Sequence, residues 1–215
     1  DYQEVITIGA AGNGSLAAAN GSEVVVDGSL VAGQSTGSQG AVSLDDSVFR
    51  FRDTLATMVI GEAGNGSLTA TNGPEIVLGG EIVVGESAGS QGVVTADNSN
   101  INPTGFGGGL RATTIGAAGN GSLIAKNGSE VTLTGGFVVG DQADSQGIVT
   151  VDNAYLELGY SNDGLVIGAA GNGSLSASNG AEVHVYDDLI VVQEVGSQGI
   201  VTIDNSNWNL YRRET

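Results

Sequence analysis

Apolar and polar residues alternate in short segments of this chain, and the segments recur along its length. In the first cycle, Leu16 and Ala18 are separated by one residue, and so are Val24 and Val26. A third segment of the same kind begins at Leu30. Alternation with a period of two is typical of a β-strand that buries one face. The pattern therefore predicts three short strands in each cycle, with turns between them.

A period of about 26 residues, within the range of solenoid repeats, organises these segments. The strings Gly-Asn-Gly-Ser-Leu and Ser-Gln-Gly alternate along the chain, and their last glycines form one column. These glycines are Gly14, Gly40, Gly66, Gly92, Gly121, Gly147, Gly173 and Gly199. Six positions after each glycine lies a second column, formed by Asn20, Asp46, Asn72, Asn98, Asn127, Asn153, Asn179 and Asn205. All steps are equal except the one from Gly92 to Gly121, which predicts a three-residue insertion around Asn102 to Gly109.

Repeated three-strand units predict one coiled domain over residues 1–215. A single unit cannot bury its own apolar side chains, whereas stacked units form a continuous core. We therefore predict an all-β fold, a single-stranded parallel β-helix (β-solenoid) with eight turns, or rungs, of about 26 residues. A right-handed coil is expected, because crossover connections between parallel strands prefer that hand.

Both repeated columns are expected to form a structural ladder without chemistry. Asn and Asp tolerate left-handed backbone angles at a corner, and stacked Asn side chains can pass amide hydrogen bonds from rung to rung. Glycine permits a positive φ at a second corner without strain at Cβ. A further repeated glycine is replaced once: Val192 stands where Gly33, Gly85 and Gly140 stand in earlier rungs.

The chain is strongly acidic and contains no cysteine. It has 6 Lys and Arg residues against 24 Asp and Glu residues, which gives a net charge of −18. Phosphate contacts need clustered Lys and Arg, so this charge argues against a nucleic-acid partner. The absence of cysteine excludes disulfides, thiolate zinc sites and a Cys nucleophile. No apolar run approaches the roughly 18 residues of a membrane helix, so we expect no membrane insertion.

No residue pattern indicates catalysis or a cofactor. His184 is the only histidine, and alternation with Val183 and Val185 places it on the outer surface. One histidine makes neither a catalytic triad nor a zinc site. The carboxylates follow the repeat, so we predict no enzyme, no catalytic residue, no cofactor site and no metal site. The adjacent acids Asp45 and Asp46 leave room for weak surface calcium binding, and a polysaccharide-active β-helix enzyme stays a remote alternative.

The repeat resembles that of bacterial surface β-helices. Segment 59–68 reads VIGEAGNGSL and segment 83–94 reads VVGESAGSQGVV, and both are similar to autotransporter passenger and related adhesin repeats. The resemblance covers nearly the whole chain. It implies a parallel β-helix at the bacterial cell surface or outside the cell, in a stalk, coat or adhesin.

The two ends of the chain begin and stop on the repeat pattern, which predicts head-to-tail self-association. The interval from Asn205 to Asn20 of a following copy would be close to the internal repeat step. The residues expected at this contact are Asp1, Glu4, Val5, Ile6, Ile8, Trp208, Leu210, Tyr211, Arg212 and Arg213. A head-to-tail contact that does not close on itself builds a filament. We therefore expect a structural fibre subunit, with a segment of a larger adhesin that binds a glycan or receptor as the alternative.

Overall fold

The computed structural model describes residues 4–102, 112–159 and 164–211, which form three parallel β-sheets and no helix. Sheet A contains β1 (Val5–Ile8), β4 (Ser29–Ala32), β7 (Met58–Ile60), β10 (Ile82–Val84), β13 (Thr113–Ile115), β16 (Phe137–Val139), β19 (Leu165–Ile167) and β22 (Leu189–Val191). Sheet B contains β2 (Asn13–Ala19), β5 (Gln39–Asp45), β8 (Asn65–Thr71), β11 (Gln91–Asp97), β14 (Asn120–Lys126), β17 (Gln146–Asp152), β20 (Asn172–Ser178) and β23 (Gln198–Ile203). Sheet C contains β3 (Glu23–Val26), β6 (Val48–Phe51), β9 (Glu75–Val77), β12 (Asn100–Asn102), β15 (Glu130–Leu133), β18 (Tyr155–Leu158), β21 (Glu182–Tyr186) and β24 (Asn207–Tyr211).

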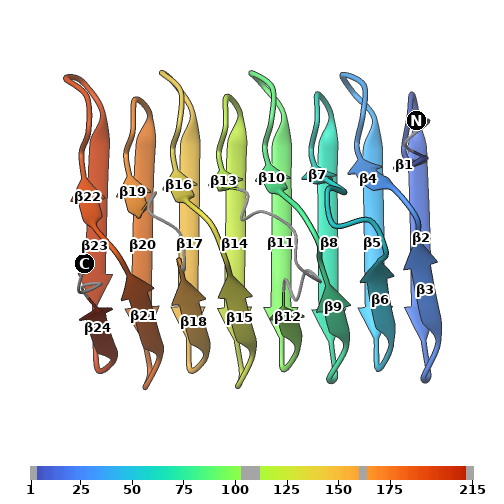
Figure 1. Cartoon of the computed structure of the whole chain (residues 1–215). Coiled ribbons are helices and arrows are strands. Elements are labelled where there is room, and N and C mark those ends of the chain that lie inside the picture. Colours follow the sequence, from blue (N-terminus) through green and yellow to red (C-terminus); the bar gives the residue numbers. More distant parts are fainter. Residues whose placement is uncertain (1–3, 103–111, 160–163, 212–215) are drawn as a thin grey trace.

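Each sheet takes every third strand of the chain, so the chain coils as a β-solenoid. Rung 1 is β1 to β3, rung 8 is β22 to β24, and the eight rungs lie side by side in chain order (Figure 1). Every strand pair is parallel and in register, as when Gly14 of β2 pairs with Gly40 of β5. The predicted all-β parallel solenoid and its repeat period are confirmed.

Corners of alternating length make odd and even rungs different. In sheet A, Ile6 pairs with Leu30 and Leu30 pairs with Met58, so the second interval along the chain is longer than the first. In even rungs the link from sheet A to sheet B is longer, and the link from sheet C to sheet A that precedes it is shorter. The two differences cancel, so the interval between successive strands of sheet B is constant between these rungs. The interval between β11 and β14 is longer, as when Gln91 pairs with Asn120, and residues 103–111 of the predicted insertion lie outside the described residues.

One continuous core runs along the inside of the coil. Leu30, Leu44 and Phe49, one from each sheet of rung 2, are all 0% exposed and belong to one cluster that extends through the stack. Burying each such side chain contributes about 1.5–3 kcal/mol. The alternation of apolar and polar residues therefore places side chains inside or outside as predicted.

Candidate functional site

The corner between sheets B and C is formed by the predicted Asn and Asp column. All eight residues have a left-handed backbone, with φ of 56° at Asn20, 46° at Asp46, 62° at Asn72, 49° at Asn98, 56° at Asn127, 48° at Asn153, 55° at Asn179 and 46° at Asn205. Asn and Asp are the non-glycine residues that tolerate this region best. The predicted conformation of the column is confirmed.

The predicted amide-to-amide ladder along this corner is wrong in its partners. Asn72 Nδ2 donates to Asp45 Oδ1 at 2.7 Å, and Asn127 Nδ2 donates to Asp97 Oδ1 at 2.7 Å. Asn179 makes the same bond to Asp152. The acceptor is thus the carboxylate of the last residue of the sheet B strand in the preceding even rung, and not the side chain of a corner residue. The hydrogen bond from Asn127 lowers the pKa of Asp97, with a smaller contribution from Lys126.

The predicted positive φ of the column from Gly14 to Gly199 is also wrong. These glycines are second residues of sheet B strands, and their φ angles are not positive. Glycine is required there by contact, because a Cβ atom on Gly66 would lie 2.2 Å from the Gly61 nitrogen and 2.5 Å from the Ala32 carbonyl oxygen. The positive φ belongs to the corner between sheets A and B, earlier in each rung, as at Gly9 and Gly61.

The outer face of sheet C is irregular where rungs 6 to 8 meet. His184 points outward, as predicted, but its side chain is only 13% exposed because neighbouring rungs cover it. Glu157 of rung 6 and Asn209 of rung 8 pair with it across the sheet. We name the group Tyr155, Glu157, Glu182, His184, Tyr186, Asn209 and Tyr211 the His184 cluster.

Hydrogen bonds join the polar members of the His184 cluster. His184 Nε2 lies 2.7 Å from Glu182 Oε1, and His184 Nδ1 lies 3.2 Å from the Tyr155 hydroxyl oxygen. The Tyr155 hydroxyl donates to Glu157, and Asn209 Nδ2 lies 3.2 Å from His184 Nε2. Three rungs are thereby tied together by side chains, in addition to the backbone pairing of sheet C.

Aromatic rings form the other half of the His184 cluster. Tyr186 and Tyr211 stack with ring centroids 4.6 Å apart and planes 15° apart. The His184 ring makes edge-to-face contacts with two tyrosines, and its centroid lies 5.1 Å from the ring centroid of Tyr155 and 5.3 Å from that of Tyr211. Three of the five tyrosines of the chain thus gather at one place on the outer surface.

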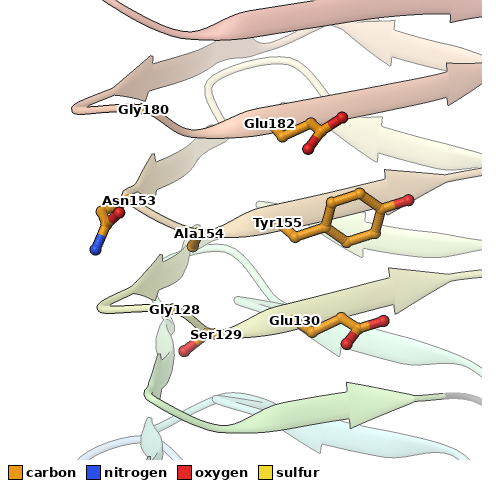
Figure 2. A pocket seen from close by; sticks show the side chains of 8 residues that line it. All are labelled: Gly128, Ser129, Glu130, Asn153, Ala154, Tyr155, Gly180 and Glu182. Atoms are coloured by element: carbon orange, nitrogen blue, oxygen red, sulfur yellow. The ribbon is translucent and has the colours of Figure 1, made fainter.

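A shallow groove of about 440 Å³ adjoins the cluster at the corner between sheets B and C. The Tyr155 side chain lies between those of Glu130 and Glu182, from the rungs on either side (Figure 2). Burial raises the pKa of Tyr155, and the hydrogen bond to Glu157 adds to the rise. The hydroxyl therefore stays protonated as a donor, which makes it a poor general base.

The described residues contain no group of three or more His, Cys, Asp or Glu side chains placed to hold a metal ion. Asp45 Oδ1 accepts the bond from Asn72 described above, and the weak calcium binding proposed for Asp45 and Asp46 stays a prediction. Among those same residues, no helix is long and apolar enough to cross a membrane.

The residues predicted for self-association lie on two different sheets. Ile6 and Ile8 belong to sheet A, whereas Trp208 and Leu210 belong to sheet C, so they are not direct partners across a stacked junction. Tyr211 packs on Tyr186 at the outer face instead. Glu4 and Val5 are exposed at rung 1, and Asp1, Arg212 and Arg213 lie outside the described residues.

The residues predicted for self-association include none from β22 or β23, although both strands belong to the end face of rung 8. Val191 and Ile203 are 41% and 49% exposed, and their strands would be edges of sheets A and B at any contact beyond rung 8. The signal was present, because both residues belong to the inward columns that the alternation defines.

The fold and repeat define the chain as a β-solenoid repeat protein. No family model matches the sequence, and comparisons with curated proteins and with solved structures give no match.

Proposed function

We propose that this chain is a non-enzymatic structural protein of the bacterial cell surface that stacks end to end into an extracellular fibre. The surface location rests on the similarity of its repeat to autotransporter and adhesin repeats. The stacking rests on the exposure of inward side chains at rung 8. Val191 and Leu210 are 41% and 55% exposed, whereas their neighbours Ile167 and Val185 in rung 7 are 0% and 1% exposed.

A second copy offers a matching surface at rung 1. Its strands β1, β2 and β3 are edges of the same three parallel sheets whose other described edges are β22, β23 and β24. Placing rung 1 on rung 8 would pair both sets of edges and bury the exposed apolar side chains. Rung 8 is an even rung and rung 1 an odd one, so the alternation of corner lengths would also continue.

Sedimentation velocity over a concentration series, combined with negative-stain microscopy, tests the fibre. We expect rods that lengthen with concentration, and we expect Leu210→Asp to abolish them because it places a charge in the contact. Thr69→Asp adds the same charge on the outer face of sheet B in rung 3, where its cross-strand partners Ser43 and Thr95 are uncharged, and should have no effect. Monomers alone at every concentration would contradict the proposal.

The adhesin alternative is favoured by one separate observation, the His184 cluster beside its groove. Tyr211 is exposed and Tyr155 and Tyr186 are half-buried, and aromatic rings at a surface with adjacent carboxylate and amide groups can stack on a sugar and hydrogen-bond to its hydroxyls. A glycan without negative charge suits this surface best, since the chain carries a net charge of −18.

Binding to an array of neutral, amino-bearing and acidic glycans tests this alternative. We expect retention of neutral or amino-bearing glycans, weakened about tenfold by Tyr211→Ala, because the variant removes the ring surface on which a sugar would stack. Thr69→Ala, on the exposed outer face of sheet B and distant from the cluster, serves as the control. An array without binding, or equal binding by Tyr211→Ala, would contradict the adhesin reading.

A further inference from the structure

One corner position changes residue type at rung 8 while its backbone stays the same. In seven rungs the corner between sheets A and B starts with a glycine of positive φ, namely Gly9, Gly33, Gly61, Gly85, Gly116, Gly140 and Gly168. Rung 8 has Val192 there, with φ of 66°. Its amide donates to the Ile167 carbonyl at 2.9 Å, as the Gly168 amide donates to Val139 at 2.8 Å.

The seven glycines are required by the rung that follows each of them. A Cβ atom on Gly9 would lie 2.1 Å from the carbonyl oxygen of Gln39, and one on Gly168 would lie 2.3 Å from that of Gln198. The other five glycines give 2.3–2.5 Å to the equivalent carbonyl. A side chain at this corner therefore occupies space that the next rung needs. Val192, by contrast, is 45% exposed.

Rung 1 has a glycine, Gly12, at a position where later odd rungs need glycine to fit against the rung before them. A Cβ atom on Gly64 would lie 2.6 Å from the Ser38 hydroxyl of the rung before it, whereas Gly12, at the same position of rung 1, has nothing within 4 Å. Ser197 stands in rung 8 where Ser38 stands in rung 2. A second copy could thus seat Gly12 over Ser197, while its Asn13 carbonyl would collide with Val192.

We propose that Val192 is a steric stop that weakens in-register stacking of a second copy on rung 8. Among the described residues, the two end faces match in sheet edges, in rung type and at the Gly12 corner, so Val192 is the side chain that opposes the contact. The inference rests on the stacking proposed above and names the residue that limits it. A β-branched residue at positive φ is itself unfavourable, so the stop is maintained at a cost in stability.

The variant Val192→Gly removes the obstruction and tests the stop. We expect it to associate at concentrations about tenfold or more below those of the unmodified chain, because overlap with a backbone carbonyl is relieved. Val192→Ala retains the Cβ atom and should behave like the unmodified chain. Val195→Gly, in the same loop at a fully exposed position, controls for loop flexibility. Sedimentation velocity and negative-stain microscopy report association, and circular dichroism confirms folding.

The outcomes separate the stop from the fibre itself. If Val192→Gly assembles and the unmodified chain stays monomeric, the stop stands and the native fibre fails. If both assemble and Val192→Gly does so more strongly, both proposals stand. Equal assembly by both overturns the stop and leaves the fibre. No assembly by either overturns both, because clearing the corner then releases nothing.

Discussion

Replacing Gly61 with alanine is expected to lower the free energy of unfolding by more than about 4 kcal/mol, or to prevent folding. Two physical terms add at this position. The backbone has φ of 78°, which costs an L-residue about 1–2 kcal/mol, and the new Cβ would lie 2.3 Å from the Gln91 carbonyl oxygen. Backbone cannot move aside there without breaking the pairing of rungs 3 and 4. Urea denaturation followed by circular dichroism measures the loss.

The matched control is Gly73→Ala, because it places an L-residue at a positive φ without a clash of the new Cβ atom. Gly73 has φ of 87° at the corner between sheets B and C, and an added Cβ meets nothing within 4 Å. We expect a loss of only about 1–2 kcal/mol. Equal losses at the two positions would mean that backbone conformation alone explains the glycines, and would remove the basis for a contact between successive rungs at Gly61.

Replacing Leu158 with alanine is expected to destabilise the fold by about 2–5 kcal/mol. Leu158 is 1% exposed and belongs to the core cluster, so truncation leaves a cavity that packed rungs on both sides cannot fill. Urea denaturation at a concentration where the chain is monomeric gives the value.

Leu210→Ala is the matched comparison, since Leu210 occupies the same inward column two rungs later. It is 55% exposed, and we expect a loss below about 1 kcal/mol in the monomer. The difference should shrink once units stack, because stacking would bury Leu210. A large loss for Leu210→Ala in the monomer would contradict the open end face of rung 8.

The His184 cluster was beyond the reach of sequence reasoning for a definable reason. Tyr155, His184 and Asn209 lie on three successive rungs, and they become neighbours only through the pairing of β18, β21 and β24. Intervals in sheet C depend on corner lengths that alternate between rungs, so a uniform repeat step does not identify these partners. Outward orientation of His184 was predictable, but its coverage by side chains of adjacent rungs was not.

The predicted ladder shows the same division at finer scale. The left-handed conformation of Asn127 follows from residue type and position, and it was predicted correctly. Its partner, Asp97 of the preceding rung, depends on which side chain reaches across the corner. For the column from Gly14 to Gly199, the repeated glycine indicated that a side chain is not tolerated. Only the structure showed that the reason is close packing of backbone against backbone and not a positive φ.

By itself the sequence determined the strands, their inward and outward faces, and their assembly into a repeating parallel coil. Those features follow from local alternation and from a period that recurs at every turn. Tertiary structure decided which residues of different rungs meet: the acceptors at the corners, the group around His184, and the space that Val192 occupies. Which residues of adjacent rungs become neighbours depends on the strand register and on the corner lengths together. The repeat pattern of the sequence does not show how these two combine in space.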